Sequence, residues 1–143
     1  MIVMQKIVIN VEWCGSNYSG GYGNPDLGVC VATGDTWEEF KQEFAEAMDF
    51  HLEGMEEHGD PLPQWAVDRD YEIEYKMATS ALLHRALKYT TLEAISRASG
   101  LRRSALKSYA TGDVCPREAQ CEKILQALKK ISADLQELAD NMK

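Results

Sequence analysis

The strongest constraint on the fold is a change of hydrophobic period near residue 78. Before it, short apolar or alternating runs bounded by glycine, proline and asparagine, which are typical of strands, flank a single helical pattern that begins after Thr36. After it, apolar positions recur every three or four residues, which is typical of helices. The sequence therefore predicts an α+β domain over residues 1–78 and an all-helical domain over residues 79–143.

The charge of the chain changes at the same place. The net charge of −8 combines two unequal parts. Residues 1–78 carry four basic and sixteen acidic side chains, a net charge of −12, whereas residues 79–143 carry eleven basic and seven acidic ones, a net charge of +4. Because a basic surface attracts polyanions and an acidic surface repels them, we expect the second domain to bind nucleic acid and the first to have a different partner.

The first domain is predicted to have the element order β-β-β-α-β. Strands are expected over residues 2–12, within 15–24, over 29–33 and over 71–76. The first strand is rich in β-branched residues, so we expect it to be well buried. Thr36 and Glu39 form a capping box before an amphipathic helix of about six turns, apolar on one face and acidic on the other, which ends before Pro61. This helix should cover one face of the sheet.

The second domain is predicted to contain four helices and one core. The helices are expected over residues 79–88, 91–99, 102–110 and 117–141. Gly100 separates the second from the third, at a point where a left-handed backbone turns the chain. The apolar residues expected to form the core are Leu83, Leu87, Ile95, Ala98, Leu101, Leu106, Tyr109, Ile124 and Leu128.

The third predicted helix leaves a set of polar side chains outside this core: Arg102, Arg103, Ser104, Lys107 and Ser108. Such a helix can enter the major groove of double-stranded DNA, where Arg and Lys reach bases or phosphates and hydroxyls reach phosphate oxygens. Arg102 stands where Ser, Thr or Asp would cap the helix better, and local rules are broken most often at functional sites. The stretch resembles the Cro/repressor-type helix-turn-helix domains, although Leu92 and Arg102 replace polar residues usual in that family.

A second resemblance covers the first domain. The residues that carry it are Pro25-Asp26-Leu27, Cys30, the run from Gly34 to Glu39, the acidic helix and Pro61-Leu62-Pro63. They resemble the HicB family, antitoxins of the HicA–HicB toxin–antitoxin systems, in which a Pro-Gly usually stands at the positions of Gly28-Val29. The resemblance implies a partial ribonuclease-H-like fold that masks a small HicA-like ribonuclease toxin, followed by a DNA-binding domain that represses the pair's own promoter.

Other residues leave alternatives open. The aromatic residues Trp13, Tyr18 and Tyr22 either contact the toxin or pack in the core. A stand-alone transcriptional regulator, whose first domain senses a ligand or dimerises, is the second hypothesis. A nuclease is the third hypothesis. A ribonuclease-H-type site needs carboxylates that converge on two metal ions, and the sequence does not require its carboxylates to converge in this way. We therefore expect no catalysis and no cofactor, and four cysteines without a Cys-x-x-Cys pair predict no metal site.

The last predicted helix extends beyond what one small core needs. Its apolar residues alternate in steps of three and four: Cys121, Ile124, Leu128, Ile131, Leu135, Leu138 and Met142. We expect the half beyond Lys130 to pair with a second subunit, giving a homodimer or a higher homo-oligomer, or to fold back on the first domain. No apolar run approaches the ~20 residues of a membrane span, and the first residues do not read as a signal peptide, so a cytoplasmic protein is expected.

Overall fold

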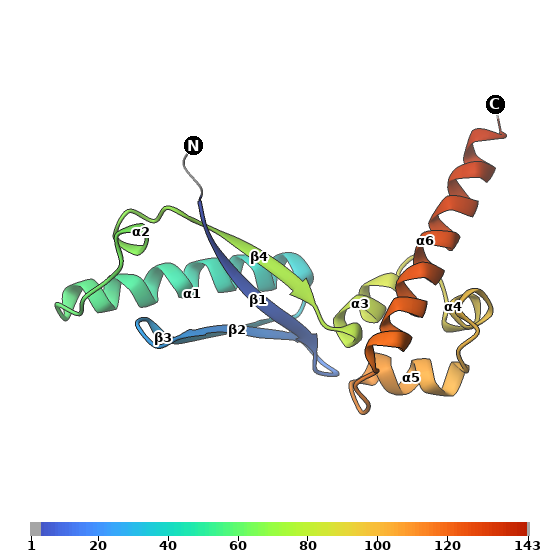
Figure 1. Cartoon of the computed structure of the whole chain (residues 1–143), viewed down its shortest axis with the longest axis horizontal. Coiled ribbons are helices and arrows are strands. Elements are labelled where there is room, and N and C mark those ends of the chain that lie inside the picture. Colours follow the sequence, from blue (N-terminus) through green and yellow to red (C-terminus); the bar gives the residue numbers. More distant parts are fainter. Residues whose placement is uncertain (1–3, 143) are drawn as a thin grey trace. The chain divides into compact units, whose positions relative to one another are not determined.

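The fold is α+β, a four-stranded mixed sheet followed by helices. The computed structural model describes residues 4–142, so the predictions for residues 1–3 and 143 lie outside the described residues. The elements of the first part are β1 (Gln5–Trp13), β2 (Tyr18–Asn24), β3 (Gly28–Gly34), α1 (Trp37–Glu57), α2 (Gln64–Val67) and β4 (Tyr71–Met77) (Figure 1). The second part contains α3 (Thr79–Ala86), α4 (Leu92–Ser99), α5 (Arg103–Thr111) and α6 (Glu118–Asp140). The chain divides into two compact units between Ala78 and Thr79, the boundary that the sequence predicts.

The sheet of the first unit has the order β3-β2-β1-β4. The strands β1, β2 and β3 form an antiparallel array, whereas β4 lies parallel to β1 with Gln5 opposite Tyr71 and Val11 opposite Met77. A parallel neighbour needs a crossover connection, which here includes α1 and the short α2. The sequence did not predict α2, because four residues after Pro63 are too short to show a helical period.

Within the described part of the first unit, α1 covers one face of the sheet. On β1, Ile7, Ile9 and Val11 are fully buried, while Val8 between them is 40% exposed. The prediction that this strand is well buried is therefore wrong for its second face, whose residues alternate with the buried ones and are exposed. On α1, buried apolar residues recur every four positions and pack on the sheet: Phe40, Phe44, Met48 and Leu52.

The start of α1 is set by local chemistry. Thr36 Oγ1 accepts a hydrogen bond from the Glu39 amide at 3.1 Å, and Glu39 Oε2 accepts one from the Thr36 amide at 3.3 Å, which confirms the predicted capping box. A side chain at Gly34 would place its Cβ 2.5 Å from the Phe40 nitrogen. The end of β3 can therefore pass beneath the first turn of α1 only because residue 34 is glycine.

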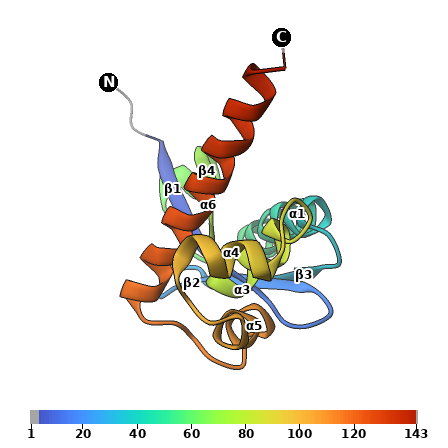
Figure 2. The ribbon, with the colours of Figure 1, turned by 90° about the vertical axis from the view of Figure 1, so that its right-hand side faces the viewer.

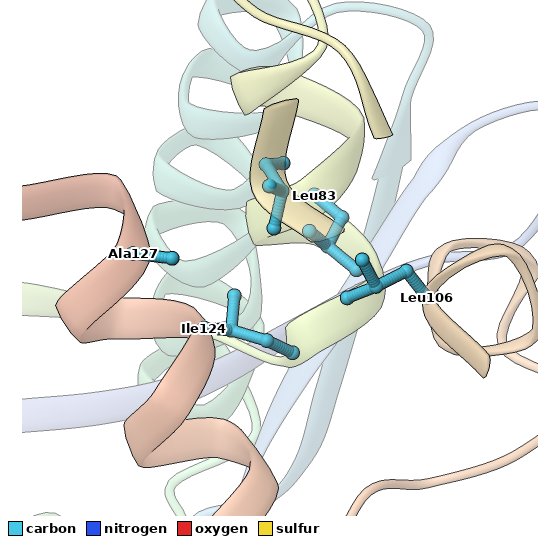
Figure 3. Close-up of a cluster of buried hydrophobic side chains, with 5 residues drawn as sticks. Leu83, Leu106, Ile124 and Ala127 are labelled. Carbon is cyan, nitrogen blue, oxygen red and sulfur yellow. The ribbon is translucent and has the colours of Figure 1, made fainter. Parts of the chain in front are cut away.

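The second unit has a single core, built from all four of its helices (Figure 3). Leu83, Ile95, Leu106 and Ile124 are fully buried, and Ala127 is nearly so. Leu87, which was predicted to belong to this core, is 38% exposed. The prediction is wrong because α3 ends at Ala86, so Leu87 lies in the turn that follows and leaves the helix face.

The C-terminal half of α6 extends beyond this core (Figure 2). Ile124 and Ala127 on its first half are buried, but Leu135 is 55% exposed and Leu138 is 63% exposed. Leu128 and Ile131 border the core. Among residues 4–142, no helix has both the length and the apolar character that crossing a membrane requires.

Candidate nucleic-acid interface

The connection between α4 and α5 is fixed by hydrogen bonds from short polar side chains. Ser96 Oγ donates to the Leu101 carbonyl at 2.5 Å, and the Leu101 amide donates to Ser99 Oγ at 3.1 Å. Gly100 adopts the left-handed conformation, with φ of 79°, as its position between the two predicted helices requires. These contacts set the direction in which α5 leaves α4.

The first turn of α4 is held in a similar way. Thr91 is the N-cap, and its Oγ1 accepts a hydrogen bond from the Ala94 amide at 3.1 Å. Leu92 packs against the core of the second unit. Leu92, one of the two residues that depart from the helix-turn-helix family pattern, is therefore a packing residue and offers no polar group to a phosphate.

The residues predicted to contact DNA gather in the first half of α5. Arg102, Arg103, Ser104 and Lys107 are exposed, while Leu106 is fully buried and holds the helix to the core. Arg102 is the N-cap of α5 and makes no side-chain capping bond, because a guanidinium has no acceptor for the amides of the first turn. Ser108 differs from the other four, because it is half-buried and its hydroxyl donates to the Ser104 carbonyl at 3.2 Å.

An ion pair joins the two helices at this surface. Arg103 Nε donates to Glu93 Oε1 at 2.6 Å. The pKa of Glu93 is lowered, first by a hydrogen bond from its own backbone amide and then by Arg103 and Thr91. Both side chains are more than half exposed, so the pair adds little to stability. Its effect is to hold the Arg103 guanidinium against the first turn of α4.

The structure adds one cationic residue that the sequence reasoning did not include in the site. Arg97, in the last turn of α4, shares a shallow depression of about 430 Å³ with Glu93, Ser96 and Arg103. The signal in the sequence was the spacing of four between Glu93 and Arg97, which places both on one face of a helix. The candidate surface therefore includes side chains from both α4 and α5.

The three aromatic residues considered for a protein interface separate into two groups. Tyr18 is only 1% exposed, and its ring meets those of Trp13 and Trp37 edge-on at 5.0 Å and 5.6 Å. Tyr18 is therefore a core residue, and its ring does not lie on the surface as a toxin contact would require. Trp13 and Tyr22 are half-buried, and the Tyr22 hydroxyl accepts a hydrogen bond from Asn24 at 3.1 Å.

The side chains that bind metals are scattered in the part of the chain that the structure describes. There, no three side chains from His, Cys, Asp or Glu gather as metal ligands would. Cys14 and Cys115 are exposed, whereas Cys30 is buried, and this burial raises the pKa of the Cys30 thiol. A thiol with a raised pKa is a poor nucleophile at neutral pH.

Comparisons of the chain with protein-family models, with curated proteins and with solved structures found no match.

The Glu93–Arg103 ion pair should make the stability of the folded protein depend on pH. Because the folded protein lowers the pKa of Glu93, its contribution to stability is fully present above the unfolded value of 4.5 and is lost as the pH falls through the lower folded value. We expect NMR titration of the Glu93 carboxyl to give a midpoint below 4.5 that rises, without reaching that value, in Arg103→Ala. An unshifted midpoint in the native chain would contradict the pairing.

Proposed function

We propose that this protein is a non-catalytic, cytoplasmic antitoxin of a HicA–HicB-like toxin–antitoxin system. In this proposal, the second unit binds operator DNA as an autoregulating repressor, and the first unit masks a small basic ribonuclease toxin. The observation that carries the proposal is the exposed cationic start of α5, where Arg102, Arg103 and Lys107 are exposed on a helix that the buried Leu106 holds to the core.

Several features of the second unit support DNA binding. A short, rigid connection joins α4 to α5, as in a helix-turn-helix, and α5 presents groups that bond to bases and phosphates. The only acidic side chain among residues 79–112 is Glu93, and its charge is countered by Arg103. The surface therefore presents a net positive charge to a polyanion.

The first unit supports the antitoxin half of the proposal. The order β3-β2-β1-β4, with β4 parallel to β1, supports the partial ribonuclease-H-like architecture that the HicB resemblance implies. The net charge of −12 over residues 1–78 would repel nucleic acid and attract a basic RNA-binding protein. Trp13 and Tyr22 stay candidates for the contact with the toxin.

A homodimer completes the proposal. One recognition helix reads few base pairs, so palindromic operators are bound by two copies. The exposed half of α6 offers the surface for pairing: beside Tyr89, the residues Leu128, Ile131 and Leu135 line an apolar depression of about 470 Å³. We propose that α6 of a second copy docks there.

The DNA-binding half is tested by alanine substitution on α5. Arg102→Ala and Lys107→Ala should each weaken binding to DNA from upstream of the gene, by about 1–3 kcal/mol where the side chain reaches a base. Lys129→Ala is the control, because it removes the same charge from an exposed position on α6. Fluorescence anisotropy at two salt concentrations measures the effect. Equal losses in all three variants would show that only net charge matters and would contradict a specific role for α5.

The dimer is tested on the full chain. Leu135→Asp combined with Leu138→Asp should convert a dimer into a monomer in light scattering, because each buries a charge in the proposed interface. Both positions are exposed in the single chain, so folding should survive. The control is Ala133→Asp, an exposed position on α6 two residues before Leu135. An unchanged mass in the double variant would rule out pairing through α6.

The antitoxin half is tested with the product of a short reading frame next to the gene. We expect a small basic protein there whose expression stops growth, and we expect this chain to restore growth and to co-purify with it. The double variant Arg102→Ala, Lys107→Ala should still restore growth, because the toxin binds the other unit. Intact DNA binding with no such partner would instead favour the stand-alone regulator.

A further inference from the structure

The two edge strands of the sheet differ in their protection against pairing with another chain. On β4, charged side chains alternate along the exposed face: Glu72, Glu74 and Lys76. On β3, the seven residues from Gly28 to Gly34 include no charge and no proline, and Val29 and Val31 are 69% and 68% exposed. Because exposed edge strands normally carry charges, proline or bulges that prevent pairing, β3 has the character of a strand that pairs with a partner.

A groove lies beside this unprotected edge. It has a volume of about 560 Å³ and is lined by β3 together with residues of α1 that include Ala47, Phe50 and Met55. Phe50 is 77% exposed, whereas the four apolar residues of α1 that face the sheet are fully buried. An exposed phenylalanine next to an unpaired strand edge provides an apolar contact for the side chains of an added strand.

The charges around the groove favour one kind of occupant. Asp26 and Asp35 are exposed just before and just after β3, and Asp60 lines the groove. Among the described residues that line it, none is lysine or arginine. A second copy of this acidic unit would meet like charges there, whereas a cationic chain would be attracted.

We propose that the free edge of β3 and the Phe50 groove bind an extended, cationic strand of a partner protein, which adds to the sheet as a fifth strand. Backbone groups of β3 hydrogen-bond the added strand, alternate apolar side chains enter the groove, and basic side chains approach the aspartates. This inference deepens the proposed function by giving the site at which a basic toxin docks, and it rests on that proposal for the partner's identity as a toxin.

The test uses the full chain labelled with ¹⁵N and a synthetic peptide as long as β3, which has 7 residues, alternating valine and lysine. The peptide should shift the amide signals of residues 28–34 and of α1 around Phe50, and added salt should weaken the effect. The matched peptide of valine and glutamate should leave these signals unchanged. Shifts that map elsewhere, or equal binding of both peptides, would overturn the proposal.

Variants on α1 and α2 sharpen the test. Phe50→Ala should weaken binding of the cationic valine–lysine peptide about tenfold, since it removes the apolar contact of the groove and adds no charge. Val67→Ala is the control, because Val67 is also exposed and apolar but does not line the groove. Equal effects of the two variants would contradict the role of the groove. Signals of β3 that shift with protein concentration alone would identify a second copy as the occupant and overturn the proposal.

This experiment contains neither toxin nor DNA, so its outcome is separate from that of the proposed function. If the peptide binds at β3 but the protein binds neither the upstream DNA nor the product of the neighbouring reading frame, only the proposed function fails. If the toxin is neutralised but no cationic peptide reaches β3, only the docking site is wrong.

Discussion

The cationic surface of the second unit depends most on the burial of Leu106. This side chain is fully buried against Leu83, Ile95 and Ile124, so it fixes the rotation of α5 about its own axis. Arg102 and Arg103 precede it by four and three residues and so lie on the same side of the helix, but they are exposed because they stand at the N-terminal end of α5. Leu106 therefore anchors the helix whose exposed first turn carries the cationic groups.

In the first unit, α1 has one face packed against the sheet and another that is exposed. The apolar residues of α1 that point to the sheet are completely covered, and Gly34 lets β3 pass close beneath the helix. Phe50 and the outer edge of β3 have no such cover in the described residues. The two units also differ in net charge, −12 over residues 1–78 and +4 over residues 79–143, and the proposed function assigns DNA to the basic unit and a basic protein to the acidic one for this reason.

Local chemistry explains which features could be predicted from the sequence. The capping box at Thr36, the left-handed Gly100 and the period of the helices are determined by neighbouring residues, and the structure confirms each of them. The features that were missed involve contacts between distant residues. Arg69 bonds to Asp49, twenty positions earlier, and Arg103 bonds to Glu93 across a turn. Tyr18 is buried in a glycine-rich strand, where no alternation of apolar and polar side chains shows which face is covered.

The most direct test of the division between the units is to follow the amide signals of the full chain by NMR while a DNA duplex from upstream of the gene is added. The account predicts perturbations in α4 and α5, strongest from Arg102 to Lys107, and none in residues 5–77 of the acidic unit. Perturbations in the sheet or α1 with none in α5, or no response at low salt, would contradict it.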